Sequence, residues 1–166
     1  MMAEIIHGEL VTRPRPASPH ALASSVLGSE LITPFHRGRG GPGGWVILDE
    51  PELHLGGHVL VPDLAGWRRQ RMPEIPTTAA FELVPDWICE VLSPVTAAVD
   101  RADKIPIYAG LGASYVWLVD PLTQTLEVYR LEGQRYLVLG TWRGDAVVRA
   151  DPFDAIELEL AALWAR

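Results

Sequence analysis

The sequence predicts an α/β fold in which helices cover the faces of a mixed β-sheet. Short apolar runs separated by turn residues recur between residues 45 and 142, which is typical of strands. Helical patterns begin at residue 18 and again near residue 99, and the second lies between two strand-like runs. This order of elements, with no long linker, predicts a single domain spanning residues 1–166.

The N-terminal part is predicted to contain a strand at residues 4–12, carried into a turn by Gly8. We expect Ser18 to cap the first helix because Pro19 then occupies the first helical position. Pro34 and the glycine-rich residues after it should end this helix. The predicted apolar stripe of the helix consists of Leu22, Val26, Leu27 and Leu31.

The middle and C-terminal parts are predicted to be mainly β-structure. Gly56-Gly57 is typical of a two-residue hairpin turn, and Gly133-Gln134 marks a second one. A helix at about residues 99–111 contains Pro106, which should kink or shorten it. The predicted strands are residues 45–50, 52–56, 58–67, 83–93 and 114–121, followed by a hairpin at 125–142.

Net charge limits the function classes. The chain carries −7, all of it from residues 73–166. An acidic protein is no general nucleic-acid binder, because phosphate neutralisation by Lys and Arg provides most non-specific affinity. Any such contact would use a local basic loop, and the best candidates are Arg68, Arg69 and Arg71, beside Trp67. The simpler interpretation of these arginines is solvated surface charge.

The expected compartment is the cytoplasm. The longest apolar stretches cover about 6–8 residues, far short of the roughly 20 that a membrane helix needs. The N-terminus lacks the pattern of a signal peptide. Cys89 is the single cysteine, which excludes an internal disulfide and suggests a small core residue.

Glu90 is the first candidate for chemistry. Side chains alternate along a strand, so Glu90 shares its face with Ile88 and Leu92. An unpaired charge between apolar neighbours is costly, so Glu90 needs a cation, a metal or a proton. The alternative is a carboxylate at a strand edge in contact with water.

Two aspartates, Asp63 and Asp86, are the last residues of identical LVPD segments. Asp86 shares a face with Glu90 but lies roughly 13 Å along the same strand, too far to share a metal whose ligands lie about 2.0–2.1 Å from it. If the strand at 58–67 pairs with the strand at 83–93, Asp63 comes within reach of Glu90, since neighbouring strands are about 4.8 Å apart.

Lys104 is the single lysine of the chain and falls on the helix that follows the Glu90 strand. Its compact ammonium is suited to orient or activate a water at a phosphate. The alternative is a surface pair with Asp100, worth a few tenths of a kcal/mol. A structural zinc site is not expected, because His54 and His58 should point to opposite sides of their hairpin.

The stretches VLVPDLAG, PDWICEVLSP and DRADKIPIYAGLGASYVWLVDP resemble the Uma-two family of restriction endonucleases, within the PD-(D/E)xK nuclease-like superfamily. The resemblance extends from GELV at 8–11 to RLEGQRY at 130–136. It implies a restriction-endonuclease-like core with an extra C-terminal hairpin. It also implies hydrolysis of phosphodiester bonds, with DNA as the expected substrate and Mg²⁺ or Mn²⁺ as cofactor.

In this resemblance Asp63 and Glu90 match the metal-binding carboxylates. The superfamily's lysine would stand at Leu92. The resemblance implies that in this family the lysine has moved to the following helix, where Lys104 stands. The bound metal would polarise a phosphoryl oxygen and lower the pKa of a water. Supporting roles around the ligands are predicted for Asp86, His20 and Glu9.

Two other functions remain open. A nuclease-like fold kept for binding alone is favoured by the net acidity and by Leu92. A small-molecule hydrolase using Asp86 and Glu90 is disfavoured by their spacing, since inverting glycosidases hold their carboxyls about 6.5–9.5 Å apart. Cleavage of a duplex would call for two sites, so a homodimer is expected, with the hairpin at 125–142 as its candidate interface.

Overall fold

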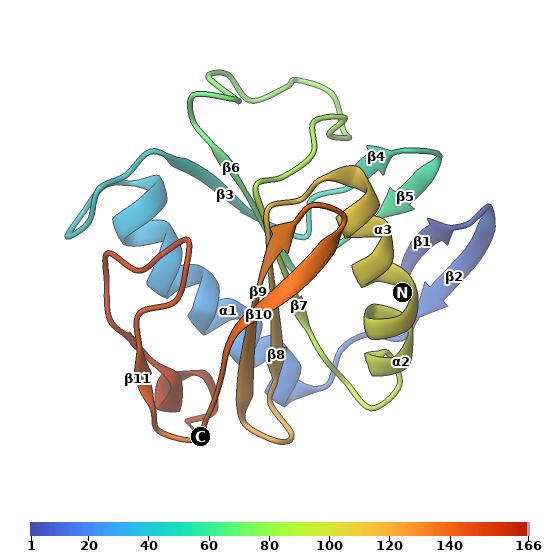
Figure 1. Ribbon diagram of the computed structural model, residues 1–166. Helices are drawn as coiled ribbons and strands as arrows, with labels where there is room; N and C mark the ends of the chain where they lie inside the picture. Colours follow the sequence, from blue (N-terminus) through green and yellow to red (C-terminus); the bar gives the residue numbers. More distant parts are fainter. Residues whose placement is uncertain (166) are drawn as a thin grey trace.

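A six-stranded mixed sheet forms the centre of the computed structural model, which describes residues 1–165 (Figure 1). Its order is β10-β9-β8-β7-β6-β3, with β7 and β8 parallel and all other neighbours antiparallel. The predicted mixed sheet is therefore confirmed. The strands are β3 Trp45–Asp49, β6 Leu64–Arg68, β7 Trp87–Val91, β8 Tyr115–Asp120, β9 Thr125–Glu132 and β10 Arg135–Arg143.

A four-stranded sheet of order β2-β1-β5-β4 joins two hairpins that lie far apart in the sequence. The pairing of Ile5 with Val59 connects them, and the turn at Gly56-Gly57 lies where it was predicted. The strands are β1 Met2–Ile6, β2 Glu9–Arg13, β4 Leu53–Leu55 and β5 His58–Leu60, and a separate pair consists of β11 Val147–Val148 and β12 Leu158–Glu159.

The predicted strand at 58–67 is in fact two strands in different sheets. β5 belongs to the four-stranded sheet and β6 to the six-stranded one. Between them the strand is interrupted at Val61-Pro62-Asp63, since proline cannot donate a ladder hydrogen bond. The break places Asp63 at the junction of the two sheets.

The first helix, α1 Ser18–Leu31, differs from expectation at both ends. Ala17 is its N-cap, without a side-chain hydrogen bond, so the predicted cap at Ser18 is wrong by one residue. Pro34 does not end the helix, which continues as the π-turn η1 Ile32–His36. In a π-turn the hydrogen bonds span five residues, as from the Arg37 N–H to the Ile32 carbonyl, and this wider spacing accommodates the missing donor of Pro34.

The second helical segment connects β7 to β8. It consists of α2 Ala97–Val99, the π-turn η2 Asp100–Lys104 and α3 Ile105–Leu111, and it ends at Gly112 in the left-handed conformation. Pro106 lies at the start of α3, directly after the π-turn. Because a proline ring crowds the carbonyl four residues earlier, the widened turn relieves that clash and leaves Asp100 and Lys104 buried. A short 3₁₀-helix, η3 Leu160–Leu163, follows β12.

The two faces of the large sheet are covered by different elements (Figure 1). Trp87, Cys89 and Val91 pack with α1 and the C-terminal segment. Ile88 and Leu92 pack with α3 and the four-stranded sheet. This alternation along β7 is the one predicted, and it directs Glu90 toward α3.

Trp67 does not form the exposed aromatic surface that its arginine neighbours suggested. It is fully buried, stacks on Phe81 at 4.9 Å and donates its indole N–H to the Leu83 carbonyl. Within residues 1–165, no helix combines the length and the apolar character needed to cross a membrane.

Candidate active site

Asp63 directly precedes β6, and Glu90 lies on the neighbouring strand β7. The antiparallel register pairs Leu64 with Cys89, so the residues that flank this pair, Asp63 and Glu90, come together. Oδ2 of Asp63 accepts a hydrogen bond of 2.7 Å from the backbone N–H of Val91. The strand pairing therefore brings both predicted metal ligands to one place.

Lys104 reaches Glu90 from the π-turn. Its Nζ lies 2.6 Å from Glu90 Oε1, 2.8 Å from Glu4 Oε2 and 3.9 Å from Asp100 Oδ1, and these side chains are completely buried. A solvent-exposed pair with Asp100, the alternative reading of Lys104, is thus wrong. Burial lowers the pKa of Lys104, but the nearby carboxylates, led by Glu90 and Glu4, raise it by more. The net shift is upward, so the ammonium stays charged.

Glu4 and Arg13 belong to this cluster although neither was singled out from the sequence. Arg13 Nη2 lies 2.6 Å from Glu4 Oε1 and 3.0 Å from Asp100 Oδ1, and Glu4 Oε2 accepts the Val61 N–H at 2.8 Å. Glu9, predicted for a supporting role, is exposed at the far end of the same strand as Arg13, and the structure does not bring it to the cluster.

The two oxygens of Glu90 have different surroundings. Oε1 accepts a 2.6 Å hydrogen bond from the Tyr108 hydroxyl and pairs with Lys104. Oε2 is buried without a hydrogen-bond partner among the described residues. Burial raises the pKa of Glu90 to about 8, against the lowering effect of Lys104. A proton or a cation is therefore needed on this carboxylate.

His20, in the first turn of α1, contacts the other predicted ligand. Its Nε2 lies 3.2 Å from Asp63 Oδ1. Burial lowers the pKa of His20, while the hydrogen bond and charge of Asp63 raise it by more, so the net shift is upward. The predicted proximity of His20 to the ligands is thus present in the structure.

The charges of the cluster do not balance. When all four carboxylates, those of Glu4, Asp63, Glu90 and Asp100, are ionised and His20 is neutral, they face two cations, Arg13 and Lys104, and leave an excess of two negative charges. Burial raises the pKa of Asp100 as well, although Lys104 and Arg13 oppose the shift. A divalent cation would match this excess in sign and magnitude.

The donor set fits Mg²⁺. Among residues 1–165, no three His, Cys, Asp or Glu side chains form a ready metal cage. Mg²⁺ does not require one, because it usually binds through one or two carboxylates and completes its shell with waters and substrate phosphates. Asp63 and the unpartnered Oε2 of Glu90 supply such oxygens.

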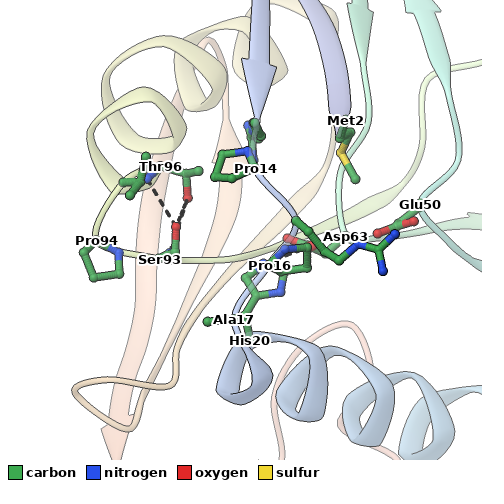
Figure 2. A pocket seen from close by; sticks show the side chains of 13 residues that line it. Met2, Pro14, Pro16, Ala17, His20, Glu50, Asp63, Ser93, Pro94 and Thr96 are labelled. Carbon is green, nitrogen blue, oxygen red and sulfur yellow. Dashed lines mark hydrogen bonds and ion pairs between the residues drawn. The ribbon is translucent and has the colours of Figure 1, made fainter.

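A pocket of about 230 Å³ opens beside the cluster (Figure 2). Asp63 and Glu50 lie on one side of it and the 93–96 loop on the other, with His20 on the helix below. Residues 13–17 complete its wall. The pocket gives solvent molecules and ligands access to Asp63, whereas Glu90 and Lys104 are shielded from it.

Comparisons with known proteins identify the family of the chain. The model of the Uma2 family, described as "Putative restriction endonuclease", matches residues 1–162. The chain belongs to the Uma2 family. A comparison with curated proteins found no match.

This Uma2 member also resembles a solved structure, that of a "putative nuclease belonging to DUF820" from Anabaena variabilis ATCC 29413. The two share 27% sequence identity, and the alignment covers 98% of this chain and 89% of the other, with a TM-score of 0.78. The nuclease-like fold class predicted from the sequence is thereby confirmed.

Asp86 lies at the opposite end of the β6–β7 pair of this Uma2 chain. Its Oδ2 accepts the Arg68 N–H at 2.8 Å, and its Oδ1 lies 2.8 Å from Arg71 Nη1. Because Asp86 precedes β7 and Glu90 stands near its end, the structure does not bring Asp86 to the Asp63–Glu90 site.

The arginines predicted to contact nucleic acid lie at that same distant end. The guanidinium of Arg68 covers the Trp45 ring at 4.6 Å, Arg71 pairs with Asp86, and Arg69 is half-buried. The length of β6 separates them from Asp63 by roughly 17 Å. Their contact with nucleic acid stays a prediction, and it would concern a phosphate well away from Asp63.

Proposed function

We propose that this protein is a metal-dependent endonuclease that hydrolyses phosphodiester bonds of nucleic acid, with DNA as the expected substrate. The observation that carries the proposal is the buried cluster, in which the carboxylates outnumber the cations and Glu90 Oε2, beside Asp63, has no hydrogen-bond partner among residues 1–165. Membership of a family described as restriction endonucleases supports it.

Asp63 and Glu90 would hold Mg²⁺ or Mn²⁺. When bound, such a metal stabilises charge on the phosphoryl group and lowers the pKa of a water. Lys104 and Tyr108 both contact Oε1 of Glu90, and its buried Oε2 has no hydrogen-bond partner among residues 1–165. Since a ligand must be deprotonated to bind a metal, Lys104 also favours the required carboxylate form of Glu90.

His20 supports Asp63 from the side of the pocket, and Glu4 supports Lys104 from the buried side. His20 contacts Asp63 Oδ1 and limits the rotation of that carboxylate. Glu4 holds Lys104 against Glu90, and it is itself held by Arg13 and by the Val61 N–H. The site is thus built by residues from three separate regions of the chain.

A homodimer would present two such sites to a duplex. The expected contact is β10, the outer strand of the large sheet, where Leu137 and Val138 are 48% and 52% exposed. An unpaired strand edge with apolar side chains can pair with a second copy. Sedimentation of the protein beside a Val138→Lys variant tests this, and a monomer at all concentrations would exclude it.

A binding module without catalysis is the second candidate. It is favoured by Leu92, a buried apolar residue at the position of the superfamily's lysine, and by the complete burial of Lys104. Such a module would keep its function when the metal ligands are changed.

Nicking of supercoiled plasmid tests the proposal. Wild type and Glu90→Gln are compared in Mn²⁺ and in EDTA over a series of salt concentrations. We expect nicking by the wild type in Mn²⁺ alone, and none by the variant, because glutamine preserves shape but offers no charge to the metal. Equal nicking by both proteins, or none by either, would contradict an endonuclease centred on Glu90.

A further inference from the structure

The two cations of the buried cluster differ in their access to the pocket. The Lys104 side chain has no exposed surface and touches carboxylates from both sides. The Arg13 side chain is 11% exposed, and Arg13 lines the pocket together with Asp63 and His20. Of these two cations, Arg13 is therefore the one that a molecule in the pocket can contact.

The guanidinium of Arg13 has donors to spare. Arginine presents five N–H groups in a rigid plane. Nη2 faces Glu4 and Asp100, and among the described residues no hydrogen bond or ion pair involves Nε or Nη1. Those groups are free to donate to a ligand without loss of the ion pairs that hold the side chain.

The neighbouring chain also holds Arg13 in place. Arg13 ends β2, where it pairs with Met2, and Pro14 and Pro16 follow it. Proline fixes φ and keeps the preceding residue extended. The arginine therefore projects from a stiff segment that forms one wall of the pocket.

We propose that Arg13 is a catalytic residue of this site, the cation that contacts the phosphate of the substrate next to Asp63. The inference rests on the proposed nuclease function and deepens it. The Nε and Nη1 groups of Arg13, which face away from Glu4 and Asp100, can each donate a charge-assisted hydrogen bond to a phosphate oxygen. Lys104 is then a positioning residue, which acts through Glu90.

The charge state of Arg13 agrees with this role. Burial lowers the pKa of Arg13, but the carboxylates of Glu90, Asp100 and Glu4 raise it by more. Arg15 provides a matched control, because it lines the same pocket but is exposed. A phosphate attracted only by general positive charge would respond to either arginine.

The test measures binding of inorganic phosphate at saturating Mg²⁺ by isothermal titration calorimetry, for wild type, Arg13→Met, Arg13→Lys and Arg15→Met. A charge-assisted hydrogen bond of about 1.5–3 kcal/mol predicts a loss of about ten- to 150-fold for Arg13→Met. Arg15→Met should stay within about twofold of wild type. Arg13→Lys keeps the charge beside Glu4 and Asp100 and should recover part of the loss.

Mg²⁺ affinity, measured in the same proteins, separates contact from structure. If Arg13 binds phosphate, Arg13→Lys weakens phosphate binding and leaves Mg²⁺ binding unchanged. Phosphate affinity in Arg13→Met equal to that of wild type or of Arg15→Met would overturn the inference, as would a parallel loss of Mg²⁺ and phosphate affinity in Arg13→Lys.

Plasmid nicking by the same variants distinguishes this inference from the proposed function. A wild type that binds phosphate through Arg13 but never nicks nucleic acid would refute the nuclease and keep the phosphate site. If the wild type nicks nucleic acid and the Arg13→Met variant nicks it equally fast, only the role of Arg13 is refuted.

Discussion

The two LVPD segments have the same sequence and end in the same kind of backbone hydrogen bond, yet their aspartates lie in opposite electrostatic surroundings. Each aspartate precedes a strand and accepts a backbone N–H from the last residue of the neighbouring strand. Asp63 accepts from Val91, and Asp86 accepts from Arg68. The antiparallel pairing of β6 and β7 relates the two positions.

The second oxygen of each aspartate makes the difference. For Asp63 it meets His20, beside a buried group of carboxylates with surplus negative charge. For Asp86 it meets Arg71, whose side chain is 38% exposed and balances it. The motif thus supplies a structural hydrogen bond at both ends, and the end at Asp63, where carboxylates outnumber cations, is the proposed metal site.

The largest expected difference between the two aspartates is in cleavage rate. Asparagine preserves an oxygen for the Val91 or Arg68 N–H but removes the charge, so both variants should fold. Asp63→Asn should slow metal-dependent nicking by about 10³-fold or more, whereas Asp86→Asn should change it only a few-fold. Equal losses in a nicking assay would show that the two ends do not differ in function.

The stability of the protein should depend on Lys104, the buried cation near Asp63. Lys104→Met leaves Glu4 and Glu90 without their shared partner, and removal of one member of a buried ion pair costs about 3–5 kcal/mol in the free energy of unfolding. Urea denaturation measures this cost. A loss below about 1 kcal/mol would mean that the cluster is held by its hydrogen bonds alone.

The pH dependence of stability should also originate at the Asp63 end. Folding raises the pKa of Glu90 from 4.5 to about 8, so between those values the folded protein keeps a proton that the unfolded chain has lost. In EDTA, the free energy of unfolding should then fall as pH rises, by up to about 1.4 kcal/mol per pH unit. The upward pKa shift of His20 acts in the same direction.

Urea denaturation between pH 5 and 8 in EDTA, with Glu90→Gln as control, measures this slope. The variant cannot release the proton and should show a clearly smaller decline. Stability that rises over this range, or an unchanged slope in the variant, would refute the assignment to Glu90.

The smallest effect is expected at the Asp86 end. Arg71→Met removes a partly exposed ion pair, and such pairs contribute about 0–1 kcal/mol. Thermal unfolding should therefore change little, and nicking should stay near the wild-type rate. A strong loss of nicking with unchanged stability would instead assign Arg71 a contact with nucleic acid.

Much of this arrangement could be predicted from the sequence because it follows from local patterns. Alternation along residues 83–93 correctly placed Glu90 on a buried face, and the pairing assumed between the two strands is present as β6 with β7. The spacing argument correctly separated Asp86 from Glu90. The predictions made from the prolines were less accurate, since π-turns accommodate both Pro34 and Pro106.

Glu4 and Arg13 could not be predicted in the same way. They join the buried cluster through the pairing of β1 with β5, a contact between segments more than fifty residues apart, and no local pattern encodes it. One signal was present, because Glu4 shares its strand face with Ile6, which is also buried. A carboxylate on an apolar face requires a partner, as it did for Glu90.

Calorimetric titration of Mn²⁺ into wild type, Asp63→Asn and Asp86→Asn would decide between the two ends of the sheet. The titration is made above the pKa of Glu90, so that protons do not compete. Wild type and Asp86→Asn should bind Mn²⁺ with equal affinity, and Asp63→Asn should bind at least about tenfold more weakly. Equal binding by Asp63→Asn and wild type, or a loss confined to Asp86→Asn, would contradict a metal site at Asp63 and Glu90.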